Sequence, residues 1–278
     1  MVQAGTATKV PAVEVAGSAY RSVFGHLSLL FDLAWLPLLI LLAVTILPGY
    51  LELYHGLPGL PAWAGDSFGL GFENIIEALV GLLCLSAFAV RWYQLLLQPS
   101  RQGSALGIFA AAWIRFLAYI MLLYLVAASL LTAVLLADSN TAPSFVAPIA
   151  GAVVLAVWLA TVRCSLVFPA AAIGASLPLA AAWKKMRGNS WRLLGVMLLV
   201  SIPTVFVVAL IFGGIVTGFH IDSVGDETPP LGLFLLRGVV SACANVLVVA
   251  LNGAALAGFY RRLVNTRGDG AALRTDQL

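Results

Sequence analysis

The sequence predicts an all-α, polytopic membrane protein with six transmembrane helices, arranged as three hairpins, and with both termini in the cytoplasm. Composition is the first reason. Of the 278 residues 62% are hydrophobic and only 10% are charged, against roughly a quarter charged in soluble domains, and the mean hydropathy is +1.02. The apolar residues also fall in long runs, and the basic residues gather on one side of those runs. These observations exclude a soluble globular domain and a nucleic-acid-binding protein that acts through surface charge.

Six apolar runs are long enough to cross a bilayer, whose hydrocarbon core of about 30 Å needs roughly 20 helical residues. They cover residues 27–47, 74–97, 109–136, 146–169, 193–219 and 231–259. The third, fifth and sixth runs are longer than needed, so we expect them to tilt. We therefore divide the chain into an N-terminal cytoplasmic tail (1–22), a transmembrane domain (23–263) and a C-terminal cytoplasmic tail (264–278), and we expect both tails to be disordered.

The basic residues predict the orientation. Apart from Arg237, every Lys and Arg lies near the N-terminus, at the junction of spans two and three, at the junction of spans four and five, or after span six. The other connections carry only acidic charges. Because Lys and Arg accumulate on the cytoplasmic side of a membrane, we expect a multi-pass protein of the bacterial inner membrane with both termini inside.

The junction of spans four and five predicts an amphipathic helix, here called the elbow (176–192), that lies in the membrane interface. We expect Ser176 to be its N-cap, and Gly188 stands where a helix usually ends. Four apolar positions share one helical face: Leu179, Ala182, Trp183 and Met186. The residues expected to bind anionic lipid headgroups or another membrane protein are Trp183, Lys184, Lys185, Arg187, Trp191 and Arg192. Tryptophan beside a basic edge suits the interface, although such an elbow can also serve only as an anchor.

The elbow run AWKKMRGNSWR, preceded by RCSLVFPAAAIG, resembles bacterial inner-membrane proteins of the YciC-like kind, which are grouped with the membrane domain of glycerophosphodiester phosphodiesterases. The similarity consists of an arginine that ends one span, a proline shortly after it, and an Ala-Trp-x-x-x-x-Gly-Asn elbow before the next span. It covers residues 163–195 best and the rest of the chain only by topology. The resemblance implies a similar number of helices and no assigned activity. We expect no attached phosphodiesterase domain, so it implies no catalytic residues.

Three ionisable residues fall within predicted spans, where a charge costs roughly 2.5–3.5 kcal/mol at the helix centre. They are Asp32, Glu77 and Arg237. We expect Asp32 to meet Arg115 or Arg163 on the cytoplasmic side. Near the outer side we expect Glu77 to neutralise Arg237, with Glu73 as the alternative partner. A substrate or proton path is the alternative role for these residues.

The last span carries a polar stripe formed by Arg237, Ser241, Asn245 and Asn252. Their spacings of 4, 4 and 7 place them on one helical face. A polar face must point into the bundle, because lipid offers no hydrogen-bond partner. The stripe either joins helices through interhelical hydrogen bonds or lines a solvated or ligand-binding cavity.

No catalytic or metal-binding pattern occurs in the sequence. The three histidines, His26, His55 and His220, are far apart, and there is no H-E-x-x-H, G-x-S-x-G or G-x-x-x-x-G-K motif. We therefore expect no catalytic residue, metal, cofactor or nucleic-acid partner. The leading interpretation is a non-catalytic scaffold or accessory subunit that engages anionic lipid or another membrane protein through the elbow. The alternative is a small-solute or lipid transporter that uses the polar stripe, and the third is a membrane-embedded enzyme.

Overall fold

The computed structural model describes residues 10–55, 72–98, 106–138, 146–218 and 231–264. Within these ranges the chain forms nine helices and no strand. The helices are α1 (Ala12–Gly25), α2 (Leu27–His55), α3 (Phe72–Leu97), α4 (Leu106–Asp138), α5 (Val146–Cys164), α6 (Val167–Ala172), α7 (Leu179–Lys185), α8 (Ser190–Gly218) and α9 (Leu231–Val264). The predicted all-α class is confirmed. The expected C-terminal tail lies outside the described residues from 265 onward.

Five of the described helices contain stretches that are long and apolar enough to cross a membrane. They are Leu27–Ile46, Ala78–Leu97, Phe109–Leu130, Ser190–Ile211 and Leu235–Val264. In α5 the described apolar stretch, Gly151–Cys164, is shorter than a span. Five apolar helices of this length indicate a multi-pass membrane protein, one span fewer than the sequence predicts.

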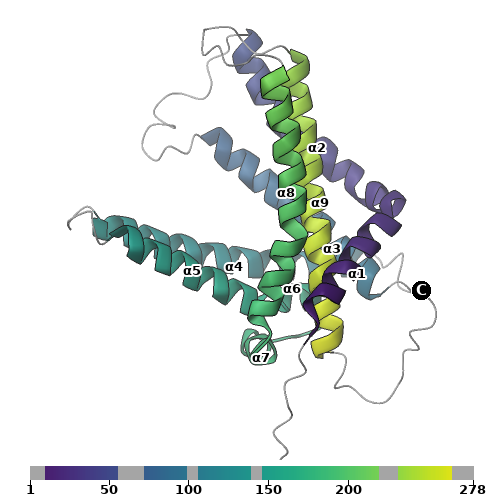
Figure 1. Cartoon of the computed structure of the whole chain (residues 1–278), viewed down its shortest axis with the longest axis vertical. Coiled ribbons are helices and arrows are strands. Elements are labelled where there is room, and N and C mark those ends of the chain that lie inside the picture. Colours follow the sequence, from purple (N-terminus) through teal and green to yellow (C-terminus); the bar gives the residue numbers. More distant parts are fainter. Residues whose placement is uncertain (1–9, 56–71, 99–105, 139–145, 219–230, 265–278) are drawn as a thin grey trace, which may run out of the picture.

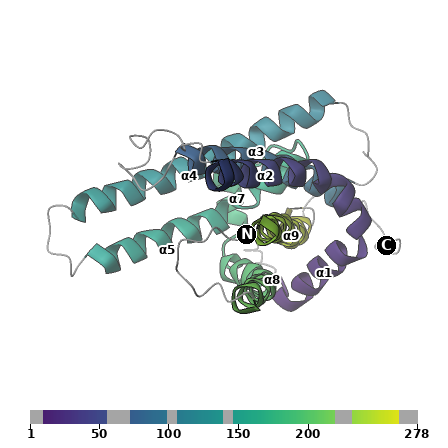
Figure 2. The same ribbon diagram turned by 90° about the horizontal axis from the view of Figure 1, so that it is seen from above.

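Helix α9 is the centre of the packing. It lies beside α8 along the long axis of the molecule (Figure 1), and α1, α2, α3 and α6 also contact it. The three consecutive pairs expected from the sequence pack together, namely α2 with α3, α4 with α5, and α8 with α9. Seen from above, α8 and α9 appear end-on, whereas the α4–α5 hairpin extends away from them (Figure 2).

The best-buried side chains lie on α1, α3, α6, the N-terminal part of α8 and the C-terminal half of α9. Trp92 and Phe259 are among the largest fully buried residues there. The Trp92 indole Nε1–H donates a hydrogen bond to the Ala250 carbonyl at 2.9 Å. A Cβ atom at Gly253 would lie 3.1 Å from Trp92 Cδ1, so the missing side chain of Gly253 is what lets α3 approach α9 this closely.

The expectation of a disordered N-terminal tail is wrong for residues 12–22, which belong to helix α1. Its residues Val15, Ala16, Ala19 and Val23 are buried, and α1 contacts α8 and α9. These positions follow the spacing of an amphipathic helix. The sequence therefore contained a helical pattern here, but the polar residues between the apolar ones made the segment resemble a tail. The predicted domain boundary at residue 22 therefore falls inside a helix.

Candidate functional site

A cavity of about 690 Å³ lies beside α9. Residues of α2, α3, α4, α5, α6, α8 and α9 line it, and most of them are apolar, such as Leu85, Phe116 and Phe168. Its volume falls within the roughly 300–1,000 Å³ of small-molecule sites in proteins. The cavity is therefore large enough to hold a ligand.

The predicted polar stripe faces this cavity. Ser241, Asn245 and Asn252 line it, whereas Arg237 does not. Asn245 is exposed and Ser241 is half-buried, and neither side chain forms a hydrogen bond with any other residue that the structure describes. Because the two lie one helical turn apart, they present an amide and a hydroxyl to the same part of the cavity.

Asn252 behaves differently from the rest of the stripe. Its Nδ2 donates to Ser201 Oγ on α8 at 3.0 Å and to the Val248 carbonyl at 2.9 Å. The side chain thus joins α8 to α9 while it borders the cavity. The sequence allowed the stripe either to form interhelical hydrogen bonds or to line a cavity. Asn252 forms an interhelical hydrogen bond, whereas Ser241 and Asn245 line the cavity without one.

Most of the other hydroxyl groups around the cavity are satisfied within the protein. Ser86, Thr161 and Ser165 each donate to a backbone carbonyl of their own helical segment. Ser86 Oγ also accepts a hydrogen bond from Trp113 Nε1 at 2.9 Å. The donor hydrogens of these hydroxyls are therefore already used, whereas their oxygens can still accept a hydrogen bond.

Three aromatic residues with polar atoms were missed by the sequence analysis. Tyr93, Tyr124 and Trp158 line the cavity from α3, α4 and α5, and none forms a hydrogen bond with another described residue. They come from three different spans, so no spacing within one helix could have grouped them. Among the described residues that line the cavity there is no Asp, Glu, Lys, Arg or His.

The predicted partners of Asp32 are wrong. Asp32 is exposed and forms no ion pair with another described residue. Arg115 is also exposed, and the Arg163 guanidinium lies 4.7 Å from the centroid of the Trp183 ring, where a cation–π contact is favourable. Arg237 is exposed, and the side chain of Glu77 lies outside the described residues, so the Glu77–Arg237 pair stays a prediction.

The elbow forms a shorter helix than expected. Helix α7 begins after Pro178, which takes the N-cap position predicted for Ser176, and no side chain caps it. Of the apolar face, Ala182 and Met186 are fully buried, while Trp183 is 41% exposed. Gly188 has a φ of +84°, the left-handed conformation that glycine adopts at little cost, and it turns the chain into α8.

Two residues of the elbow bind the N-terminal segment. Asn189 is buried, and its Oδ1 accepts a hydrogen bond from the Val10 N–H at 3.2 Å. Arg192 is half-buried, and its Nη1 donates to the Val10 carbonyl at 2.9 Å. Arg192, which the sequence analysis assigned to lipid or partner binding, therefore makes a contact within the chain.

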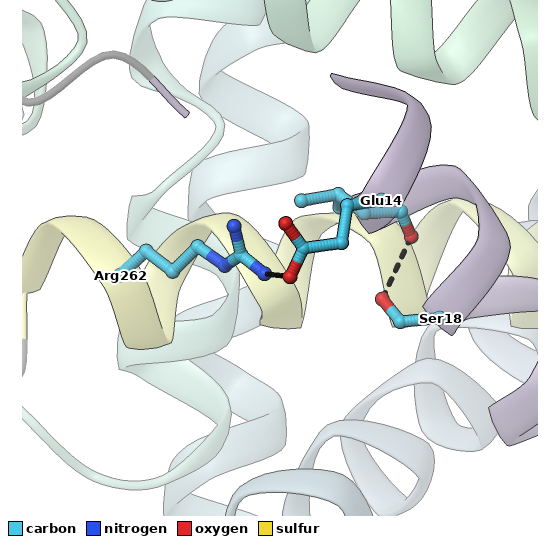
Figure 3. A network of polar contacts seen from close by, with 4 residues as sticks. Glu14, Ser18 and Arg262 are labelled. Carbon is cyan, nitrogen blue, oxygen red and sulfur yellow. Dashed lines mark hydrogen bonds and ion pairs between the residues drawn. The ribbon is translucent and has the colours of Figure 1, made fainter. Parts of the chain in front are cut away.

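Helix α1 has two further polar ties. Glu14 Oε1 and Arg262 Nη2 of α9 form an ion pair at 2.5 Å, and Ser18 Oγ nearby donates to the Val15 carbonyl (Figure 3).

Tyr20 of α1 donates its hydroxyl hydrogen to the Val200 carbonyl of α8 at 3.0 Å. The Leu199 carbonyl lies 3.4 Å from the same hydroxyl, and it has no helical N–H partner because Pro203 follows four residues later. Burial raises the pKa of the Tyr20 hydroxyl above its ordinary value.

No protein-family model, curated protein or solved structure matches the chain. No group of three or more His, Cys, Asp or Glu side chains that could hold a metal ion occurs in the part of the chain that the structure describes. The fold and the cavity therefore define the class of the protein, which is a multi-pass helical membrane protein with a cavity among its apolar helices.

Proposed function

We propose that the protein is a carrier that binds a lipid-like molecule in the cavity beside α9. One observation supports this function above all. Asn245 and Ser241 lack a hydrogen-bond partner among the described residues and border a mostly apolar space. A polar side chain that faces an apolar space instead of water is unfavourable in free energy as long as it has no hydrogen-bond partner. A ligand with a polar group at this position would offset that cost, whereas a stripe that serves only as interhelical contact would be satisfied by neighbouring helices.

The location of the cavity suits a ligand that comes from the bilayer. Tyr124 and Trp158 line the cavity and are still 64% and 43% exposed, so the space is open beside the α4–α5 hairpin. All five apolar spans contribute to its walls, and so does the shorter apolar stretch of α5. A molecule dissolved in the membrane would therefore reach the cavity without leaving the apolar phase.

The proposed topology has six spans, with α5 as the sixth crossing, both termini in the cytoplasm and the bacterial inner membrane as the location. The distribution of Lys and Arg supports it. It places the elbow and helix α1 on the cytoplasmic side. We also propose that the protein is related to YciC-like proteins, on the basis of residues 163–195.

The carrier function is tested by asking whether the purified protein retains a small molecule. Native mass spectrometry of the protein extracted in mild detergent would detect one bound molecule of lipid mass. Asn245→Trp fills the cavity and should abolish the adduct. Cys243→Trp is the matched control, because Cys243 is exposed on the same helix and does not line the cavity. Equal retention by both variants, or no adduct on the unaltered protein, would contradict the proposal.

A scaffold or accessory subunit is the second candidate function. The exposed tryptophans of the elbow favour it, because Trp183 and Trp191 (41% and 66% exposed) stand beside the exposed Lys184 and Arg187. Such a surface suits anionic headgroups or the interfacial part of another membrane protein. The two functions are compatible, since the elbow and the cavity use different residues.

A further inference from the structure

Resting on the proposed function, we infer that the ligand is an uncharged lipid whose polar part presents carbonyl oxygens, such as the esters of a diacylglycerol, and that the cavity rejects lipids with an ionised headgroup. The inference concerns the chemical class of the ligand. It follows from which polar groups line the cavity, which of them are already bonded, and which charges are missing.

The described lining offers nothing to neutralise a charge. It contains no acidic, basic or imidazole side chain. Transferring an ionised group into an apolar environment is far more costly than transferring a neutral polar one, unless an opposite charge is paired with it. Arg237 continues the stripe by one turn but is not part of the lining. A phosphate or carboxylate inside the cavity would therefore have no counter-ion among these residues.

The unbonded groups of the lining are rich in hydrogen-bond donors. Trp158 has only a donor, the indole N–H, and Tyr93, Tyr124 and Ser241 each have a hydroxyl hydrogen. The Asn245 amide adds two donor hydrogens and one acceptor oxygen. By contrast, the indole N–H of Trp113 already donates a hydrogen bond to Ser86 Oγ. Acceptor oxygens on the ligand would satisfy these donors, and ester carbonyl groups are strong uncharged acceptors that have no donor hydrogen of their own.

The shape of the cavity fits an elongated apolar body. On α9 the lining runs from Ser241 to Leu256, which is roughly 22 Å at 1.5 Å per residue. Apolar side chains such as Val248, Val249 and Leu256 occupy the positions beyond Asn245. The ligand's carbonyl group would lie near Ser241 and Asn245, with its hydrocarbon chain along the rest of α9.

The test compares two photoreactive probes that carry the same diazirine-labelled acyl chains. One is a diacylglycerol and the other is the corresponding phosphatidate, so that they differ only by the phosphate. The full-length protein in nanodiscs of neutral phospholipid is titrated with each probe, irradiated, and digested to map the labelled peptides. We expect saturable labelling of cavity-lining segments of α3, α5 and α9 by diacylglycerol, at least about tenfold stronger than by phosphatidate.

Variants locate the site of recognition. The double change Ser241→Ala with Asn245→Leu removes both unpartnered groups of α9 and should weaken labelling of the cavity by roughly tenfold. Asn245→Gln keeps the amide and should retain labelling, and Cys243→Leu is the control outside the cavity. The comparison of the two probes on the unaltered protein does not depend on whether any variant folds.

Each outcome has a distinct meaning. Preferential labelling of the cavity by diacylglycerol, lost in the double variant, supports the inference. Equal or stronger labelling of the cavity by phosphatidate would overturn the inference about ligand class, while the proposed carrier function would stand. Labelling that never maps to the cavity with either probe would overturn both.

Discussion

Asn189 and Val10 are joined by a hydrogen bond across 179 residues of sequence, from the Val10 N–H to the buried Asn189 Oδ1 at 3.2 Å. Arg192 binds the carbonyl of the same residue. Together they satisfy both backbone groups of Val10, directly before helix α1 begins. The left-handed conformation of Gly188 ends the elbow and brings Asn189 to this position, which gives the Gly-Asn pair of the elbow motif a physical role.

Replacing Asn189 should release the N-terminal segment. In Asn189→Ala the Val10 N–H loses its partner in a buried setting, which costs about 1–3 kcal/mol. We expect a lower midpoint of thermal unfolding and faster amide hydrogen exchange in α1, measured by mass spectrometry in nanodiscs. Arg187→Ala, an exposed residue of the same elbow, is the control. If both variants exchange alike, the Asn189 contact does not hold α1 in place.

Two glycines of the apolar helices should respond oppositely to alanine. At Gly253 a Cβ would meet Trp92 Cδ1 at 3.1 Å, and Trp92 is fully buried and bonded to Ala250, so Gly253→Ala should destabilise by about 1–3 kcal/mol. At Gly195 no atom lies within 4 Å, so Gly195→Ala should stabilise α8 by up to about 1 kcal/mol. Unfolding in a graded series of denaturing detergent measures both. A stabilising Gly253→Ala would show that α3 and α9 are not packed this closely.

The sequence was sufficient for features that one helix carries by itself. Hydropathy located the long helices, and the spacing of Ser241, Asn245 and Asn252 correctly placed them on one face. Contacts between distant segments were not predictable. Nothing near Val10 indicates that Asn189 binds it, and Tyr93, Tyr124 and Trp158 converge only through the packing of three helices. The predicted pairing of Asp32 was wrong for a related reason. The sequence places Asp32 and Arg163 in the same half of the membrane, but it does not indicate which face of α2 packs against other helices.

The elbow should enrich anionic lipid around the protein. Each basic residue near a membrane surface contributes about 1 kcal/mol, screened by salt. In vesicles containing spin-labelled phosphatidylglycerol, we expect Lys184→Gln with Arg187→Gln to reduce the motionally restricted fraction at low salt. Arg115→Gln removes an exposed charge outside the elbow and should leave more of that fraction intact. An unchanged fraction in the double variant would leave the elbow as a simple anchor.

The six-span topology predicts where reporter enzymes are active. Fusions after Gln102 or Asn189 should be active only in the cytoplasm, and fusions after Asp138 or Asp226 only outside it, because the basic junctions stay inside. Alkaline phosphatase and a fluorescent protein that folds only in the cytoplasm report the two sides. Phosphatase activity after Asn189 would contradict the six-span topology and the cytoplasmic position of the elbow.

The central claim is that the polar face of α9 borders a space occupied by a ligand. An experimental structure of the protein in native-lipid nanodiscs, determined by electron cryo-microscopy, tests it most directly. We predict elongated non-protein density along α9 between the α4–α5 hairpin and α3, with a polar atom at hydrogen-bonding distance from the Asn245 amide, about 2.7–3.2 Å. The contradictory result is an α4–α5 hairpin packed directly against α9, with the Asn245 amide bonded to one of its side chains and no space between them.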